Sequence, residues 1–292
     1  MDYYLGIDAG GTHTRARLVT AEGLVVGTGE AGPANTRIGL PEALGAVAEA
    51  YLQALGQAGL DASALNTMRA GLGIAGLNRR GVLPGLQEHD FPFRSIAFAS
   101  DAAVANLGAH AGGDGAVVIV GTGSIGFARV GEEVYTIGGY GFPISDEGSG
   151  ADLGLTAIRR SLWARDGRTA RSAMTDEVLA TFQGSAGRIV DWAARAAPAD
   201  YAAFAPLVMD HASAGDPIAE AIVQAAAHRL DRLIRVLLEK GAPSCCLMGG
   251  LAARMRDWLA ASIRERLSEP LGDALDGAIL LARTRAAAKE AA

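Results

Sequence analysis

The chain contains one local pattern twice: a short apolar strand enters a glycine turn and leaves it as a second strand. The first copy reads GIDAGGTHTRARLV from Gly6, and the second reads IVGTGSIGFARV from Ile119. A further strand follows each copy, so each predicts an antiparallel meander. The repetition predicts two domains of similar architecture, which suits a length of 292 residues. Two unrelated hairpins are the alternative interpretation.

The first predicted domain spans residues 1–112. After its three strands, the spacing of apolar residues from Leu44 to Leu55 predicts an amphipathic helix that Pro41 opens. The runs RAGLGIAGL and SIAFASD predict buried strands. The run DAAVANLGAHAGG then predicts a short helix that ends in glycine.

The second predicted domain spans residues 113–292 and is mainly helical after its three strands. The clearest helix has Asp216 as N-cap, followed by proline. The run SCCLMGGLA predicts a strand and a glycine turn, and one helix is expected to carry the apolar residues from Met255 to Leu267. An alanine-rich helix near 274–290 ends the chain and could pack on the first domain.

The charge balance limits the classes of partner. A formal charge of −6 and a pI near 5.4 offer no broad basic surface, so we expect no nucleic-acid partner. No apolar run reaches the length of a membrane span, and the first residues lack the pattern of a signal peptide. We therefore expect no membrane partner and a cytoplasmic location. Cys245 and Cys246 are adjacent in an apolar run and are interpreted as small buried hydrophobes.

The first glycine turn has the composition of an anion-binding loop. Gly10 and Gly11 carry no Cβ, so their backbone N–H groups can approach a phosphate, and Thr12 and Thr14 can add hydroxyl donors. Asp8 lies beside this turn, where a bare triphosphate would repel its carboxylate. A magnesium ion, held directly or through water, would relieve that repulsion. An ordinary hairpin turn explains the same residues equally well.

Two further turns repeat this composition. The residues Gly121, Thr122, Gly123 and Ser124 follow the apolar run AVVIV, and Met248 to Gly250 end a strand before a helix. None of the three turns is a GxxxxGK[ST] phosphate loop or a GxGxxG fingerprint. Each is weak alone, but their occurrence in this order indicates a nucleotide-binding protein.

Seven segments stand out along the chain: GIDAGGTHT, GIAGLNR, SDAAVA, GTGS, GGYGFPISDEGSG, AGDP and MGGLA. Together they resemble the actin, sugar kinase and Hsp70 superfamily, and within it the N-acetylglucosamine kinase and BadF-type ATPase family. The resemblance implies an α/β fold of two ribonuclease-H-like domains that flank a nucleotide cleft, with ATP and Mg²⁺ as cofactors. It also allows a homodimer, because dimers are common among similar proteins.

The resemblance places the catalytic base at Asp101. The position agrees with the chemistry of a base, because Asp101 ends an apolar strand and begins a helix whose dipole favours the carboxylate. A simple helix N-cap is the alternative role, and the two roles are compatible.

Other site residues follow from the same resemblance. Asp146 is expected to accept hydrogen bonds from the sugar, with acidic capping of the next helix as its alternative. The family loop commonly reads GGWG, whereas this chain has Tyr140, which keeps an aromatic surface. The expected sugar contacts are Asn35, Asp101, Ser124, Ile125, Gly139, Tyr140, Gly141 and Asp146. The expected nucleotide contacts are Gly10, Gly11, Thr12, Thr14, Gly121, Thr122, Gly123, Gly215, Gly249, Gly250 and Ala253, and Asp8 matches a magnesium-associated position.

The implied reaction is ATP-dependent phosphorylation of an amino sugar, N-acetylglucosamine or glucosamine, at its C6 hydroxyl. Two alternatives share the nucleotide turns. One is the ATPase that activates a 2-hydroxyacyl-CoA dehydratase, but such proteins carry cluster-binding cysteines that this chain lacks. The other is a non-catalytic sugar or ATP-binding regulator, which Asp8, Asp101 and Asp146 together disfavour.

Overall fold

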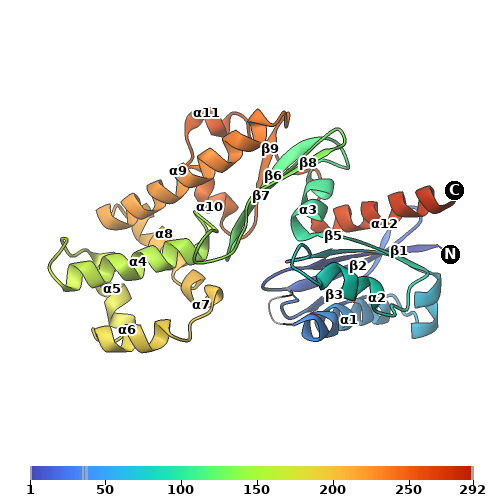
Figure 1. Ribbon diagram of the computed structural model, residues 1–292, viewed down its shortest axis with the longest axis horizontal. Helices are drawn as coiled ribbons and strands as arrows, with labels where there is room; N and C mark the ends of the chain where they lie inside the picture. Colours follow the sequence, from blue (N-terminus) through green and yellow to red (C-terminus); the bar gives the residue numbers. More distant parts are fainter. Residues whose placement is uncertain (1, 35, 37–38, 291–292) are drawn as a thin grey trace. The chain divides into compact units, whose positions relative to one another are not determined.

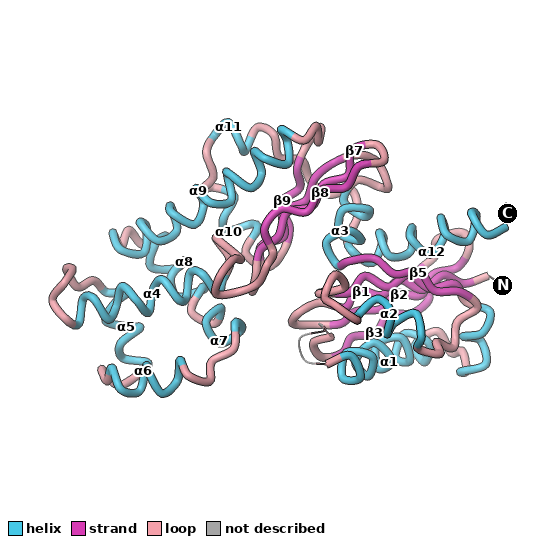
Figure 2. The backbone as a smooth tube through the Cα atoms, viewed as in Figure 1, coloured by secondary structure: helices cyan, strands magenta, loops and turns pink. Residues whose placement is uncertain are grey.

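The chain divides into two compact units, each built around its own sheet (Figures 1 and 2). The structure is a computed structural model that describes residues 2–34, 36 and 39–290, with the backbone alone for 285–290. Unit 1 comprises Met1–Gly115 and Glu269–Ala292, and unit 2 comprises Ala116–Ser268. The expected boundary at 112/113 therefore lies near the observed division, but residues 269–292 belong to unit 1 instead of the second domain.

Unit 1 has a five-stranded sheet in the order β3-β2-β1-β4-β5. Strands β1 to β3 form the expected antiparallel meander, and β4 and β5 continue the sheet in parallel with β1. Every residue of β4 is buried, as a central parallel strand requires. The strands are β1 (Tyr3–Ala9), β2 (Thr14–Thr20), β3 (Val25–Ala31), β4 (Arg69–Ile74) and β5 (Ser95–Ser100).

Helices cover both faces of this sheet (Figure 1). Helix α1 packs on β2 and β3, while α12 packs on β1, β4 and α3 from the opposite face. Backbones approach closely on both faces, because Gly27 and Gly29 lie against α1 and Gly6 and Gly71 lie against α12. The helices of unit 1 are α1 (Leu40–Gln57), η1 (Ala62–Thr67), α2 (Val82–Glu88), α3 (Asp101–Ala109) and α12 (Ala274–Glu290).

Unit 2 has a four-stranded sheet in the order β8-β7-β6-β9, with β9 parallel to β6. The predicted second meander is confirmed, because β6, β7 and β8 are neighbours in the sheet and β7 pairs with β8 in antiparallel. The strands are β6 (Gly115–Val120), β7 (Ser124–Val130), β8 (Glu133–Gly138) and β9 (Cys245–Met248). The helices are α4 (Gly150–Arg165), α5 (Ala173–Thr181), α6 (Ala186–Ala193), α7 (Pro198–Ala202), α8 (Ala205–Ser213), α9 (Pro217–Glu239), α10 (Ala252–Arg256) and α11 (Ala261–Arg264).

The prediction of one helix in unit 2 is wrong. The segment from Met255 to Leu267 was expected to be continuous, but α10 and α11 are separate short helices. Ala260 is extended between them, and its N–H donates to the buried carboxylate of Asp231 on α9. This tertiary contact satisfies the Ala260 N–H outside a helix, so a new helix begins at Ala261.

Among the described residues, no helix combines the length and apolar character that crossing a membrane requires.

Candidate active site

Unit 1 places Asp8 and Asp101 at the same edge of its sheet. Asp8 lies near the end of β1 and pairs in register with Gly73 of β4, which pairs with Ala99 of β5. Asp101 follows β5 directly. Because carboxyl ends of parallel strands meet at one edge, the two carboxylates are close enough for the charge of Asp8 to raise the pKa of Asp101.

Asp101 is partly buried and is not the N-cap of α3. Ser100 fills the N-cap position of α3, where its hydroxyl accepts a hydrogen bond from the Ala103 N–H at 3.1 Å. Asp101 accepts one from the Ala102 N–H at 2.9 Å. Desolvation is the main cause that raises the pKa of Asp101 to about 6, with the nearby Asp8 charge adding to it. A carboxylate with this pKa is ionised at neutral pH yet more basic than an exposed aspartate.

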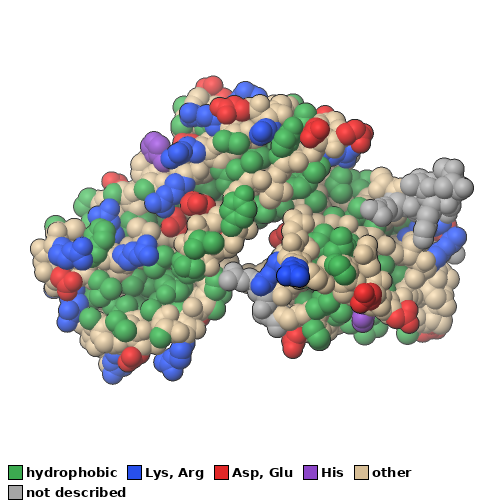
Figure 3. Space-filling view, viewed as in Figure 1, with side chains coloured by type: hydrophobic (Ala, Val, Ile, Leu, Met, Phe, Trp, Pro, Cys, Tyr) green, Lys and Arg blue, Asp and Glu red, His purple; other side chains and the backbone are tan. Residues whose placement is uncertain are grey.

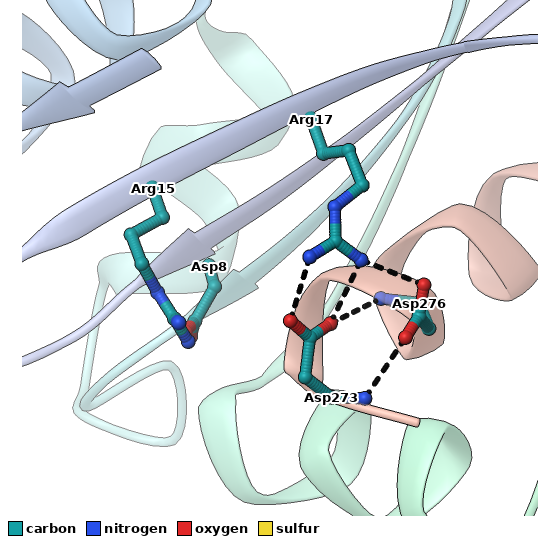
Figure 4. Close-up of polar contacts among 5 residues, drawn as sticks. All are labelled: Asp8, Arg15, Arg17, Asp273 and Asp276. Atoms are coloured by element: carbon teal, nitrogen blue, oxygen red, sulfur yellow. Dashed lines mark hydrogen bonds and ion pairs between the residues drawn. The ribbon is translucent and has the colours of Figure 1, made fainter. Parts of the chain in front are cut away.

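Asp8 pairs with Arg15 across the β1–β2 hairpin. The Arg15 Nη2 to Asp8 Oδ2 distance is 2.7 Å, and the two residues face each other in register (Figure 4). Desolvation raises the pKa of Asp8, and the hydrogen bond from Arg15 opposes that shift. The Arg15 guanidinium therefore offsets part of the cost of burying the Asp8 carboxylate at the sheet edge.

Sequence reasoning missed Arg15 and a second ion-pair cluster beside it. Arg17 donates to Asp273 and Asp276 with N–O distances of 2.7 Å each, and so joins β2 to the beginning of α12 (Figure 4). The alternation of β2 gave a signal, since Arg15 and Arg17 lie on one face of the strand. Their acidic partners on α12 are more than 250 residues away, so local patterns could not reveal them.

The first glycine turn joins β1 to β2. The Gly10 N–H donates to the His13 carbonyl at 3.0 Å, which closes the turn, and Gly11 and Thr12 are exposed. Thr14, a further expected nucleotide contact, is the first residue of β2. Its side chain is fully buried and its hydroxyl donates to the Gly32 carbonyl at 2.7 Å, so it supports the hairpin.

The second glycine turn of the chain, residues 121–124 in unit 2, contacts the N-terminus of α4. The Gly121 N–H donates to the Gly123 carbonyl, and the N–H groups of Gly150 and Ala151 donate to the carbonyls of Gly121 and Thr122 at 2.8 and 3.1 Å. These bonds fix the turn against a helix end whose dipole favours anions.

The segment after β8 folds back onto this turn. Asp146 has a φ of 66° and its Oδ2 lies 2.7 Å from the place where a Cβ on Gly123 would be, so Gly123 makes room for this carboxylate. Ser149 is the N-cap of α4, and its hydroxyl accepts a hydrogen bond from the Asp152 N–H. Ser124 is buried and its hydroxyl donates to the Glu147 carbonyl at 2.8 Å, so it holds the segment in place.

The remaining expected sugar residues are placed as follows. Gly139 has a φ of 71° and lies over the Ile125 side chain, whereas Tyr140 is 79% exposed. The Gly141 carbonyl accepts the Ser145 N–H at 3.0 Å. Asn35 lies outside the described residues.

The third glycine turn packs against the end of β6. Gly249 has a φ of 98°, and a Cβ on it would overlap the Val120 carbonyl oxygen, which accepts the Leu251 N–H at 3.1 Å. Gly250 and Ala253 are exposed beside it. The second and third turns therefore meet at one end of the unit 2 sheet. Gly215 has a φ of 85° in the α8–α9 turn, with open space around it.

The donor set suits Mg²⁺ held mainly by other ligands. Among the described residues, no group of three or more His, Cys, Asp and Glu side chains could enclose a metal ion. Mg²⁺ commonly binds through one or two carboxylates, several waters and substrate phosphates. Asp8, already paired with Arg15, fits a contact through water.

A model of the BadF/BadG/BcrA/BcrD ATPase family matches residues 5–282. This chain belongs to that family. It is 39% identical over 282 residues to the glucosamine kinase GspK of Vibrio cholerae, a match that covers 97% of this chain and 96% of that protein.

Solved structures agree with this membership. A candidate N-acetylglucosamine kinase from Chromobacterium violaceum matches with a TM-score of 0.91 and 36% identity, over 96% of this chain and 98% of that one. A ROK family glucokinase from Streptomyces griseus, solved with glucose and AMPPNP, matches with a TM-score of 0.56 and 20% identity over 97% and 98% of the two chains. The second likeness concerns the fold alone. The expected α/β fold with two actin-like ATPase domains is confirmed.

Proposed function

We propose that this chain is an ATP-dependent hexosamine kinase that uses Asp101 as its base. The observation that carries the proposal is the setting of Asp101, a carboxylate of raised pKa at a sheet edge that is free of the capping role. The family is one of ATPases, and a relative that matches nearly the whole chain is a glucosamine kinase. Phosphoryl transfer needs positioning and charge neutralisation more than covalent catalysis, and one base completes the requirement.

The proposed roles divide between the two units. In unit 1, Asp101 accepts the proton of the attacking sugar hydroxyl, and Asp8 would hold Mg²⁺ through water. Mg²⁺, when bound, would neutralise charge on the phosphates. In unit 2, Asp146 accepts hydrogen bonds from sugar hydroxyls. Nucleotide contacts are assigned to Gly10, Gly11, Thr12, Gly121, Thr122, Gly123, Gly215, Gly249, Gly250 and Ala253, and further sugar contacts to Asn35, Ile125, Gly139, Tyr140 and Gly141.

The proposed acceptor is the C6 hydroxyl of glucosamine or N-acetylglucosamine. This hydroxyl is the primary alcohol of a hexosamine, so it is the least hindered nucleophile that the ring offers. We assign Ser124 the role of holding the segment that contains Asp146, because its hydroxyl donates a hydrogen bond to the Glu147 carbonyl.

A substrate panel tests this function. ADP release is measured with ATP and Mg²⁺ against glucosamine, N-acetylglucosamine, N-acetylmannosamine and glucose. We expect an amino sugar to give the highest kcat/KM, and mass spectrometry of the product to show one added phosphoryl group at C6. ADP release that is equal with every sugar and without sugar would contradict the proposal and favour a regulatory ATP-binding protein.

A further inference from the structure

A cavity in the helical part of unit 2 is separate from every residue assigned above. It is a wide, open hollow at the surface with a volume of about 640 Å³. Helices α5, α6 and the beginning of α8 form it, and α6 lies on the side of α4 away from the unit 2 sheet (Figure 1).

Aromatic side chains form the inner wall of the cavity. The Trp192 ring lies 5.4 Å from Phe182 and 5.9 Å from Phe204, measured between ring centroids. Phe182 and Phe204 are almost fully buried, whereas Trp192 is only partly buried and lines the cavity. Tyr201 is a third neighbour, with its ring centroid 4.7 Å from that of Trp192. A partly exposed indole held in place by three other rings provides a rigid apolar surface at little entropic cost.

Charged side chains line the same cavity. Arg188, Asp191 and Trp192 lie on α6 at spacings of three and four residues, and Arg195 lies in the turn that follows this helix. The three charged side chains are exposed, and basic and acidic side chains lie side by side over α6 in Figure 3. Within the part of the chain that the structure describes, the side chains of Arg188, Asp191 and Arg195 have no ion-pair or hydrogen-bond partner. Two guanidinium groups and one carboxylate are thus available to a ligand.

We propose that this cavity binds a sugar that carries an anionic group. The two arginines suit a phosphate or carboxylate, which guanidinium groups bind through paired hydrogen bonds. Asp191 can accept hydrogen bonds from ring hydroxyls or an ammonium group. The Trp192 ring suits the apolar C–H face of a pyranose. The hexosamine phosphate formed by the proposed function has all of these features, so this choice of ligand rests on that function.

Calorimetric titration without ATP tests the proposal on the full-length chain. The probes are glucosamine 6-phosphate, glucuronate and glucosamine. The variant Arg188→Gln/Arg195→Gln removes both positive charges, and its matched control Arg232→Gln/Arg235→Gln removes two exposed charges from α9 of the same unit. We expect the first variant to lose about tenfold or more in affinity for glucosamine 6-phosphate at one site, as loss of charge-assisted hydrogen bonds implies. The control should match the wild type.

The probes separate the sources of the anion. Tighter binding of glucosamine 6-phosphate than of glucuronate supports the phosphate product, and the reverse order identifies a sugar acid as the ligand. Glucosamine binding should be equal in all three proteins. Equal affinity and stoichiometry of both anionic sugars in the two double variants would overturn the proposal, as would no binding of either to the wild type. Failure of the kinase function would appear in ADP release and would leave these titrations unchanged.

Discussion

At the scale of single residues, Ser100 and Asp101 have different roles at the start of α3, and this difference leaves Asp101 available as a base. The Ser100 hydroxyl caps α3, so the adjacent carboxylate keeps lone pairs for another partner. Burial then makes that carboxylate costly to ionise and more basic. If the Asp101 carboxylate capped α3 instead, it would be occupied by the helix N–H groups and less available as a base.

The pKa of Asp101 predicts the acidic limb of the pH–rate profile. A base must be deprotonated to act, so kcat/KM should rise as pH increases through about 6 and then level off. Steady-state rates between pH 5 and pH 8 measure this midpoint. A limb near pH 4 would mean that the catalytic base has the pKa of an exposed carboxylate.

The same shift predicts that Asp101→Asn stabilises the fold. The folded protein holds the Asp101 proton more tightly than the unfolded chain, so ionisation costs stability as pH rises from 3.8 to about 6. The amide cannot ionise, and at pH 7 the free energy of unfolding should increase by roughly 1–3 kcal/mol. Urea denaturation at pH 7 and pH 4 measures the difference, which should shrink at the lower pH. A less stable variant at pH 7 would be inconsistent with the assigned burial.

At the scale of elements, the last helix is fixed to unit 1 by an ion-pair cluster. Arg17 contacts both Asp273 and Asp276 at the start of α12. Desolvation tends to raise the pKa of Asp273, but hydrogen bonds and the charge of Arg17 outweigh it and lower the pKa. The cluster therefore stabilises the fold above the unfolded pKa of 3.8, and this contribution is lost as pH falls through the folded value.

Arg17→Ala should lower the free energy of unfolding by roughly 1 kcal/mol at pH 7, because the aspartates are partly exposed and solvent screens the pairs. The loss should shrink as pH falls below 3.8 and through the lowered pKa of folded Asp273. Arg17→Lys is the matched control, since it keeps the charge and loses the two-pronged geometry. Denaturation midpoints that are equal for wild type and Arg17→Ala at pH 7 would show that the cluster contributes nothing.

Close backbone packing against α3 also holds α12 in unit 1. A Cβ on Gly277 would overlap the Val104 carbonyl oxygen, and one on Gly108 would overlap the Asp273 carbonyl oxygen. Gly277→Ala should therefore destabilise the protein by roughly 2–4 kcal/mol. Gly45→Ala on α1, where the added methyl meets open space, should stabilise it by about 0.5–1 kcal/mol. Thermal unfolding of both variants checks the contrast, and similar melting temperatures would refute the packing argument.

The success of sequence-based prediction follows the range of the interactions. The meanders and the Asp216 cap are local, so alternation and turn residues were enough to predict them. The break between α10 and α11 depends on Asp231 from another helix, and the Arg17 cluster joins opposite ends of the chain. The composition of the first glycine turn pointed to Asp8, and the family resemblance pointed to Asp101. The Asp8–Arg15 pair became visible only with the strand register.

At the scale of the whole molecule, two units with separate cores repeat one arrangement, a glycine turn at the end of an apolar strand. Membership of an ATPase family and likeness to a glucosamine kinase along nearly the whole chain give this arrangement a chemical meaning. Cys245 and Cys246 are buried in β9, and burial raises the pKa of Cys245 to about 12. Such a thiol stays protonated and is a poor cluster ligand, which disfavours a redox activator.

The central claim is that Asp101 accepts the proton of the sugar hydroxyl during phosphorylation. The most direct measurement is the formation of glucosamine phosphate from ATP by wild type and Asp101→Asn, with ATP affinity measured in parallel. The account predicts sugar phosphate from the wild type, a loss of more than about a thousandfold in kcat for the variant, and similar ATP affinity. Turnover of the variant within about tenfold of the wild type would contradict the account.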